Sequence, residues 1–218
     1  DHRDLHSFPT RRSSDLTTED FKSRLHYLIK EKGASTSTIN QLISAFKIFY
    51  VDVCHREWEE FHVKRPRTEK KLPVVLSLEE IGRLISVTSN LKHKAILMLT
   101  YSAGLRRMEV LQIKPKDIDS ERMQVRIVQG KGKKDRYSIL SQKTLEVLRQ
   151  YYLAERPAKY LFEPMGHKGK ALSERLVEHI VKKSAKKAGI KKDISFHTLR
   201  HCFARSEEHT SELQSRQV

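Results

Sequence analysis

The stretch from Phe196 to Ala204 carries three polar side chains whose types and spacing suit phosphate chemistry. His197, Arg200 and His201 lie among apolar residues at spacing three and four, which predicts a packed helix with a cationic outer face. A guanidinium group keeps its proton and can bridge two oxygens of one phosphate. An imidazole near neutral pH can donate a hydrogen bond or move a proton. The pattern therefore favours a site that stabilises negative charge on phosphate oxygens.

A metal site is the alternative for the same residues. His197 and His201 are one helical turn apart, the spacing that two zinc ligands on a helix use. The metalloprotease arrangement, however, needs Glu directly after the first His, where this chain has Thr198, and Arg200 would repel a cation. We expect no metal and no other cofactor. For His201 two interpretations stay open, support of a phosphate and packing of the helix.

A second planar cation occurs far upstream in the segment Gly104–Asp119, GLRRMEVLQIKPKDID. Arg106 follows a glycine that permits a break between helices, and Glu109 comes one helical turn later. Residues at i and i+3 of a helix are neighbours, so Glu109 can hold the Arg106 guanidinium in place. Taken alone, both residues would be read as ordinary surface charges.

A basic turn is expected between two short strands. Met123–Val128 and Arg136–Leu140 alternate as strands do, and Gly130–Arg136, GKGKKDR, joins them as a hairpin. Glycines on both sides of Lys131 let the backbone approach a groove closely. Lys133 and Lys134 add charge. By itself this turn would be an ordinary solvated one.

The segment Val63–Pro73, VKRPRTEKKLP, is basic, contains two prolines and has almost no apolar content, so we expect an extended linker. Its cations either contact a phosphate backbone or are only solvated. They are Lys64, Arg65, Arg67, Lys70 and Lys71.

Helices must position these groups. Residues 17–63 read as helical, with an apolar repeat after the capping cluster Ser35–Thr38; they form a partial helical domain or belong to the main core. The repeat consists of Ile39, Leu42, Phe46, Phe49 and Val53.

The rest of the chain is also mainly helical. Ser77 and Glu80 form a capping box before a helix, and Lys92–Ser102 predicts a buried helix that ends at Gly104. Further helices follow Ser141, with Leu145, Leu148 and Tyr152 as its apolar face, and Ser173, ending near Gly189. The expected fold class is mainly α with a small antiparallel β-sheet.

Composition narrows the class of partner. The chain has 43 Lys and Arg against 27 Asp and Glu, a net charge of +16, which favours a polyanionic partner, although a merely soluble or a ribosome-associated basic protein fits as well. Two cysteines support neither a disulfide framework nor a Cys-rich zinc site. No apolar run approaches the roughly 20 residues that cross a bilayer, so no membrane is implied.

Both ends of the chain differ in character from its middle. His6–Leu16, HSFPTRRSSDL, and Arg205–Ser215, RSEEHTSELQS, resemble translated sequencing-adapter sequence, and such segments are set aside before a fold is argued. We therefore expect residues 1–16 and 205–218 to be adapter-derived artefacts.

Four segments together resemble one family, the tyrosine site-specific recombinases, also called phage integrases. They are STSTINQLISAFKIFY (Ser35–Tyr50), GLRRMEVLQIKPKDID, GKGKKDR and HTLRH (His197–His201), in this order and spacing. The resemblance implies a partial helical DNA-binding domain of the core-binding, SAM-like type at 17–63, a basic linker at 64–73, and a recombinase catalytic domain at 74–204 that is truncated before its nucleophile.

The resemblance also implies roles. Arg106 and Arg200 would clamp the scissile phosphate, Lys131 would protonate the departing 5′ oxygen and His197 would act as general acid or base, while Glu109 and His201 support them. Lys133 and Lys134 would contact the DNA backbone. The family places its tyrosine nucleophile beyond HTLRH, and we assign it to none of the tyrosines of this chain, which are Tyr27, Tyr50, Tyr101, Tyr137, Tyr151, Tyr152 and Tyr160.

By resemblance, the full-length parent is expected to be a mobile-element recombinase or integrase that cleaves and rejoins DNA through a phosphotyrosyl intermediate. It would bind double-stranded recombination sites as a homotetramer in the cytoplasm of a prokaryote, or be phage-encoded. The present chain would bind DNA without cleaving it. A noncatalytic DNA-binding accessory protein or repressor of the same fold, and a type IB topoisomerase, are the alternatives.

Overall fold

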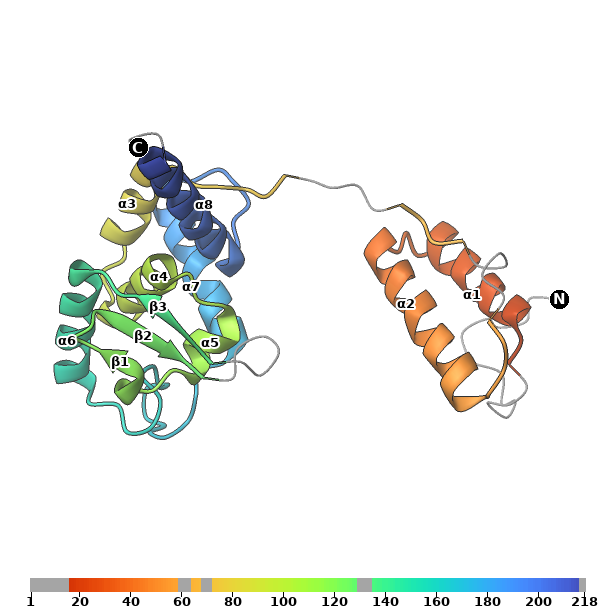
Figure 1. Cartoon of the computed structure of the whole chain (residues 1–218), viewed down its shortest axis with the longest axis horizontal. Helices are drawn as coiled ribbons and strands as arrows, with labels where there is room; N and C mark the ends of the chain where they lie inside the picture. The colour runs from red at the N-terminus through yellow and green to blue at the C-terminus, as the bar shows by residue number, and fades with distance from the viewer. Residues whose placement is uncertain (1–15, 59–63, 68–71, 129–134, 216–218) are drawn as a thin grey trace. The chain divides into compact units, whose positions relative to one another are not determined.

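The computed structural model of the chain describes residues 16–58, 64–67, 72–128 and 135–215, with side chains described as far as residue 206. The chain divides into two compact units, Asp1–Lys71 and Leu72–Val218 (Figure 1). Each unit has its own apolar core. The boundary falls inside the segment expected to be a linker.

The described part of the first unit contains a pair of α-helices, α1 (Thr18–Lys30) and α2 (Thr36–Ile48). Thr17 and Asp20 form a capping box at the start of α1, and the Ser35 hydroxyl accepts a hydrogen bond from the amide of Thr38 at the start of α2. The cap expected at Ser35–Thr38 is thus confirmed.

A small apolar core joins these two helices. Leu25 of α1 packs with Ile39 and Ile43 of α2, and the rings of Phe21 and Phe46 stack with their centroids 3.9 Å apart. The helical repeat does not continue as expected after α2, because residues Phe49–Val53 form a wider π-helical turn. The extra residue in this turn rotates the later side chains, and Val53 is 62% exposed.

The second unit contains ten elements among its described residues, and Figure 1 shows helices around a small sheet. In chain order they are α3 (Leu78–Ser86), α4 (Leu91–Ala103), α5 (Arg107–Gln112), a 3₁₀ turn (Pro115–Asp117), β1 (Ile118–Asp119), β2 (Gln124–Ile127), β3 (Arg136–Ile139), α6 (Gln142–Glu155), α7 (Glu174–Lys187) and α8 (Phe196–Ser215).

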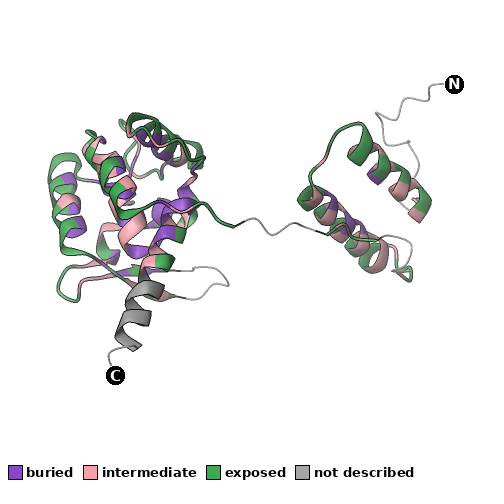
Figure 2. Cartoon of the chain, turned by 90° about the horizontal axis from the view of Figure 1, so that it is seen from above, coloured by how far each residue is buried: buried purple, intermediate pink, exposed green. Residues whose placement is uncertain are grey.

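Helix α4 is the centre of this unit. It contacts α3, α6, α7, α8 and β3, and six of its residues are buried. Figure 2 shows the buried positions of this unit gathered in its interior. Ile96, Leu97 and Leu99 are each at most 1% exposed. The prediction of a buried helix over Lys92–Ser102 is confirmed. A helix buried all round cannot shift easily, so the loops at its ends are fixed points for a site.

The sheet is antiparallel, in the order β1-β2-β3. Both expected strands are present, and the turn between them lies outside the described residues. The two-residue strand β1 was not predicted, since so short a segment shows no alternation. Fold class is therefore confirmed as mainly α with a small antiparallel sheet.

Strand β3 turns its polar residues inward. Val125 and Ile127 of β2 are buried, and they pair with Ser138 and Arg136 of β3, so these four residues share the inner face. The apolar residues of β3 lie on the outer face, with Tyr137 61% and Ile139 52% exposed. A strand that turns its arginine inward and exposes its isoleucine indicates a polar contact beneath it.

The later helices follow the sequence pattern with one correction. Helix α6 buries Leu145 and Leu148 as expected, but Tyr151, 1% exposed, is its buried tyrosine, and Tyr152 is 44% exposed. Tyr151 packs against Phe162, a partner that helical spacing does not reveal. Helix α7 begins after the Ser173 cap and ends before Gly189, as predicted.

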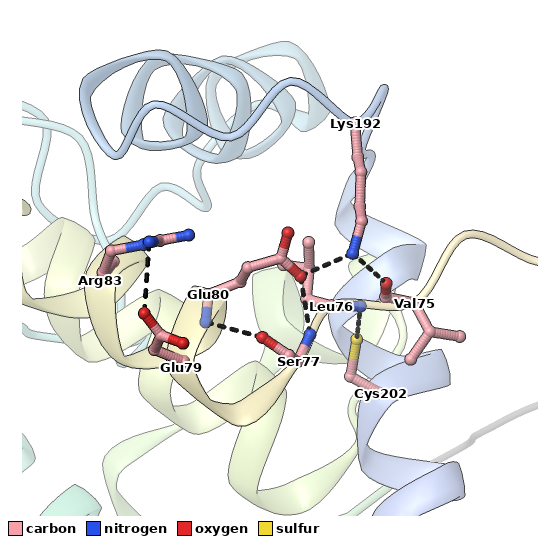
Figure 3. Close-up of polar contacts among 8 residues, drawn as sticks. All are labelled: Val75, Leu76, Ser77, Glu79, Glu80, Arg83, Lys192 and Cys202. Atoms are coloured by element: carbon pink, nitrogen blue, oxygen red, sulfur yellow. Dashed lines mark hydrogen bonds and ion pairs between the residues drawn. The ribbon is translucent and has the colours of Figure 1, made fainter.

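The first residues of the second unit are tied to two distant segments (Figure 3). Ser77 and Glu80 form the predicted capping box of α3. The Lys192 ammonium donates to the Val75 carbonyl at 3.1 Å and to Glu80 Oε2 at 2.7 Å. The amide of Leu76 donates to the Cys202 sulfur of α8 at 3.2 Å.

The backbone of α8 continues as a helix beyond Ala204 to Ser215, through the segment that resembles adapter sequence. Across the part of the chain that is described, no helix has the length and apolar character needed to span a membrane.

Candidate functional site

The turn between α4 and α5 is the point at which the candidate residues meet. Gly104 ends α4 in the left-handed conformation, with φ of 56°, which glycine adopts without strain. A Cβ atom at this position would overlap the Phe203 ring of α8. Glycine is thus required here both by the turn and by the close approach of α8.

Arg106 and Glu109 form the contact that helical spacing predicted. Glu109 Oε1 accepts from Arg106 Nη1 at 2.9 Å, and Glu109 Oε2 accepts from the Arg106 backbone amide at 2.7 Å. The Glu109 side chain is 7% exposed and the Arg106 side chain 35%. The neighbouring Arg107 instead pairs with Glu174 of α7 at 2.5 Å. The two adjacent arginines therefore serve different contacts.

Arg136 also binds the Glu109 carboxylate, which sequence reasoning did not foresee. Its Nη2 donates to Glu109 Oε2 at 2.7 Å, and its side chain is 34% exposed. The signal in the sequence was the order of polar and apolar residues in β3, because Arg136 and Ser138 alternate with Tyr137 and Ile139. Only burial shows which of the two sets faces inward.

Arg200 reaches the same place from α8. Its Nη1 donates to the carbonyl of Gly104, the residue that precedes Leu105 and Arg106. The pKa of Arg200 is lowered by burial first, and then by the cations of Arg106 and Arg136, while Glu109 acts in the opposite direction. Arg106, Arg136, Arg200 and Glu109 are hereafter called the arginine cluster.

The carboxylate within the arginine cluster is ionised. Burial alone would raise the pKa of Glu109, but hydrogen bonds from the amide and guanidinium of Arg106, together with the Arg136 cation, outweigh this and hold the pKa below its usual range. Three guanidinium groups and one carboxylate leave the cluster with an excess of positive charge.

His197 and His201 lie on the outer side of α8. Both are exposed, whereas Phe196, Leu199 and Cys202 face the core. The start of α8 is fixed by Glu178 of α7, whose Oε2 accepts from the Phe196 amide at 3.2 Å. Exposure does not support the packing interpretation of His201 and leaves both imidazoles accessible to a partner.

The remaining predicted site residues lie elsewhere. Lys131, Lys133 and Lys134 of the hairpin turn, and Lys70 and Lys71 of the linker, lie outside the described residues. Lys64, Arg65 and Arg67 are exposed and belong to the first unit. Within the described ranges, no group of three or more His, Cys, Asp or Glu side chains could hold a metal ion.

The arginine cluster has the properties of an oxyanion site. Planar cations held by a carboxylate, a strand and a carbonyl cannot reorient freely, so they are preorganised to bind two oxygens of a phosphoryl group. Partial exposure of Arg106 and Arg136 leaves such a group access. The fold and this cluster together define a class, a mainly helical domain that carries a partly exposed arginine cluster and is preceded by a separate helical unit.

Comparison with known families gives this class its name. Residues 75–206 match the phage integrase family, and residues 3–60 match the SAM-like N-terminal domain of phage integrases. Since the first match alone covers more than half of the chain, the protein belongs to the phage integrase family.

Individual relatives agree with this family assignment. Integrase/recombinase y4qK of Sinorhizobium fredii is 40% identical over 190 residues, covering 87% of this chain and 61% of the relative. Integrase/recombinase y4eF of the same organism is 38% identical over 189 residues, covering 86% of this chain and 75% of the relative. The chain thus spans less than two thirds of the length of the first relative and three quarters of the second.

Solved structures show the same fold. The crystal structure of XerA recombinase superposes with a TM-score of 0.60 at 27% identity, covering 92% of this chain and 72% of that one. XerH site-specific recombinase bound to its difH substrate superposes with a TM-score of 0.71 at 22% identity, covering 90% of this chain and 61% of that one. The fold is that of the tyrosine recombinases.

Proposed function

We propose that this chain binds the scissile phosphate of duplex DNA, and that its full-length parent is a site-specific recombinase. The observation that carries the proposal is the arginine cluster, in which the start of α5 and strand β3 bring two guanidinium groups to one carboxylate and α8 brings a third to the Gly104 carbonyl. Membership of the phage integrase family and the names of the relatives, integrase and recombinase, support the same substrate class.

The proposed reaction is a transesterification. A tyrosine hydroxyl loses its proton and attacks phosphorus, the bond to the 5′ oxygen breaks, and a 3′-phosphotyrosyl bond conserves the energy of the phosphodiester. The released 5′ oxygen takes up a proton. A 5′ hydroxyl of the partner strand then reverses these steps and joins the new pair of strands.

The residues of this chain would act on the phosphate rather than supply the nucleophile. Arg106 and Arg200 would bind the nonbridging oxygens, whose negative charge increases in the transition state. His197 would donate a hydrogen bond or move a proton there, with His201 in support, and Lys131 would protonate the 5′ oxygen, as the family resemblance suggests.

We assign the nucleophile to none of the seven tyrosines. Tyr151 is buried, and burial raises its pKa; the hydroxyl of Tyr101 is hydrogen-bonded to Ser206 of α8, and Tyr137 is on the outer face of the sheet. Covalent catalysis needs an activated nucleophile within reach of its phosphate. The chain is therefore proposed to bind DNA without cleaving it.

The assembly follows from the number of strands. Exchange between two duplexes requires a cut in each of four strands, and one arginine cluster can serve one phosphate at a time, so we propose that the parent acts as a homotetramer on paired sites. The basic residues Lys64, Arg65 and Arg67 would contribute backbone contacts. A reaction on prokaryotic or phage DNA would occur in the cytoplasm.

The test is duplex binding measured by fluorescence anisotropy across a series of salt concentrations. We expect the logarithm of the affinity to fall linearly with the logarithm of salt, because released counterions drive the binding. Arg106→Ala should weaken binding and reduce the slope by about one phosphate contact. Arg122→Ala, an exposed arginine outside the arginine cluster, is the matched control.

A denaturing gel of the same mixture tests the second part of the proposal. No band that joins protein to DNA should survive denaturation. A stable covalent adduct would show that one of the seven tyrosines is a nucleophile, and salt-independent binding would argue against the DNA-binding function itself.

A further inference from the structure

We infer that Arg136 is a positioning residue of the phosphate site: it fixes the Glu109 carboxylate, and through it Arg106, and offsets the negative charge of that carboxylate. The inference rests on the proposed phosphate-binding function and adds to it a residue whose effect is exerted through Glu109.

The geometry places one carboxylate between two guanidinium groups. Glu109 Oε1 is bound by Arg106 at 2.9 Å and Oε2 by Arg136 at 2.7 Å, while the backbone amide of Arg106 also donates to Oε2 at 2.7 Å. Both carboxylate oxygens are thereby occupied, and the buried side chain of Glu109 has one orientation that satisfies all three donors. Rotation of the carboxylate would break the contact to Arg106, so Arg136 restrains the guanidinium of Arg106 indirectly.

The charges explain why a second arginine is needed. Glu109 and Arg106 alone would be a neutral pair, and Arg200 would be left as the one surplus cation of the arginine cluster. With Arg136 on the other carboxylate oxygen, the cluster keeps a surplus of two positive charges. That surplus matches a phosphodiester whose negative charge increases on the way to its transition state.

The position of Arg136 is set by the sheet and by α4. It pairs with Ile127 of β2, which is buried, and two residues later the Ser138 hydroxyl donates to the carbonyl of Ala103 at 2.7 Å. Ala103 is the last residue of α4 and directly precedes Gly104, whose carbonyl binds Arg200. Strand β3 is thus anchored to the same turn that receives α8.

The contact with Glu109 does not use every hydrogen-bond donor of Arg136. Its Nε atom is buried, and no hydrogen-bond partner for it is present within the described part of the chain. The Nε atom of Arg107, which pairs with Glu174, is likewise buried and without a partner among the described residues. By contrast, Arg126, on the outer face of the sheet, pairs with Asp135 at 3.1 Å with both side chains about half exposed, as a surface ion pair does.

The experiment uses inorganic phosphate as a probe and follows the Nε–Hε resonances of the arginine side chains by ¹⁵N NMR. We expect Arg136→Ala to weaken phosphate binding about tenfold, because the negative charge of Glu109 is no longer offset and Arg106 is less restrained. Arg136→Lys, which keeps the charge but cannot form the same contact, should lie between this variant and the wild type. Arg126→Ala on the outer face should bind phosphate as the wild type does.

A double variant separates positioning from simple support of the fold. In Arg136→Ala/Glu109→Gln the uncompensated negative charge is gone, while the amide oxygen of the glutamine can still accept from Arg106, so phosphate affinity should recover to within about threefold of the wild type. If Arg136 only held the fold together, a second change in the same contact would weaken binding further. Circular dichroism and thermal unfolding of each variant show whether it is folded.

The experiments distinguish failure of the inference about Arg136 from failure of the proposed function. If the wild-type chain binds neither phosphate nor duplex DNA, the proposed function is wrong. If the wild-type chain binds both and Arg106→Ala weakens phosphate binding, the proposed function stands. The inference about Arg136 is then wrong if Arg136→Ala leaves phosphate binding unchanged, or if the double variant binds phosphate as weakly as Arg136→Ala.

Discussion

The three arginines of the cluster carry the same charge, but each is held by a different kind of partner. Arg106 binds a carboxylate on its own helix, Arg136 reaches that carboxylate from a strand, and Arg200 binds a backbone carbonyl. In each case one part of the guanidinium is engaged by the protein while the group as a whole stays partly exposed. A guanidinium group is planar and has several N–H donors, so it can bind the protein with some of them and a ligand with the others.

The contact of Arg200 with a backbone carbonyl predicts that a positive charge at residue 200 is not enough for full phosphate affinity. Arg200→Lys keeps the positive charge, but a single ammonium cannot bind the Gly104 carbonyl and two phosphate oxygens in one plane. We expect phosphate affinity, measured by the same NMR titration, to fall about tenfold while thermal stability changes little. Wild-type affinity in this variant would contradict a bidentate role for Arg200.

A second buried carboxylate, Glu163, has a structural role. It is 5% exposed and accepts hydrogen bonds from the backbone amides of Ala158, Lys159 and Tyr160, at 3.1, 2.7 and 3.0 Å. Burial raises its pKa, but the amide hydrogen bonds lower it more, so the pKa of the folded state lies below its usual value. Its ionised form therefore stabilises the folded chain.

The stability of the second unit should depend on this carboxylate in a defined pH range. A lowered folded-state pKa means that the stabilisation is fully present above the unfolded-state pKa, about 4.3, and is lost as pH falls through the folded value. Glu163→Gln should lower the free energy of unfolding by about 2 kcal/mol at neutral pH. The deficit should shrink below about pH 4, when urea unfolding is followed at several pH values.

Glu146→Gln is the matched control for this measurement. Glu146 is exposed on α6 and hydrogen-bonds the Gln142 side chain, so its substitution should change stability by no more than about 0.5 kcal/mol. An equal loss of stability in both variants at every pH would contradict the role of the Glu163 hydrogen bonds.

At the scale of elements, Gly104 lies where α4, α5 and α8 meet. Its left-handed backbone ends α4, its carbonyl binds Arg200, and its missing side chain admits the Phe203 ring. The site therefore depends on a turn that has no functional group of its own.

Gly104→Ala should disturb both stability and the arginine cluster. The left-handed conformation costs about 1 kcal/mol for a residue with a Cβ, and overlap with Phe203 adds about 1–3 kcal/mol. Urea unfolding should show this loss. In Gly104→Ala/Phe203→Ala the overlap is relieved, so the double variant should be less destabilised than the sum of the two single variants. Strict additivity would mean that Phe203 does not press on this turn.

The sequence predicted the elements better than it predicted their contacts. Helix limits follow from caps such as Ser77 with Glu80, and the Arg106–Glu109 contact follows from helical spacing, because both are local. The Arg136–Glu109 contact joins residues 27 apart in the chain and depends on which face of β3 is buried. Likewise, Tyr151 rather than Tyr152 is buried because Phe162 packs there, and helical period alone does not distinguish the two.

At the scale of the whole molecule, the chain consists of two units with separate cores. Each unit carries one free cysteine: Cys54 in the first is partly exposed, and Cys202 in the second is buried. Burial raises the pKa of the Cys202 thiol, which lowers its reactivity further.

Thiol labelling in increasing urea should therefore report the two units separately. Cys54 is expected to react with a chromogenic disulfide reagent under native conditions, and Cys202 to react in step with unfolding of the second unit. Cys54→Ser and Cys202→Ser variants assign each labelling phase. Labelling of both thiols in a single transition would show that the units unfold together.

The contacts of Leu76 and Val75 have a mechanical consequence. The residues between the linker and α3 are held by two hydrogen bonds. The Leu76 amide donates to Cys202 of α8, and the Val75 carbonyl accepts from Lys192, which precedes α8 in the chain. Tension applied along residues 72–75 is thus borne in part by the helix that holds Arg200, and traction at this end of the unit would be transmitted to the arginine cluster.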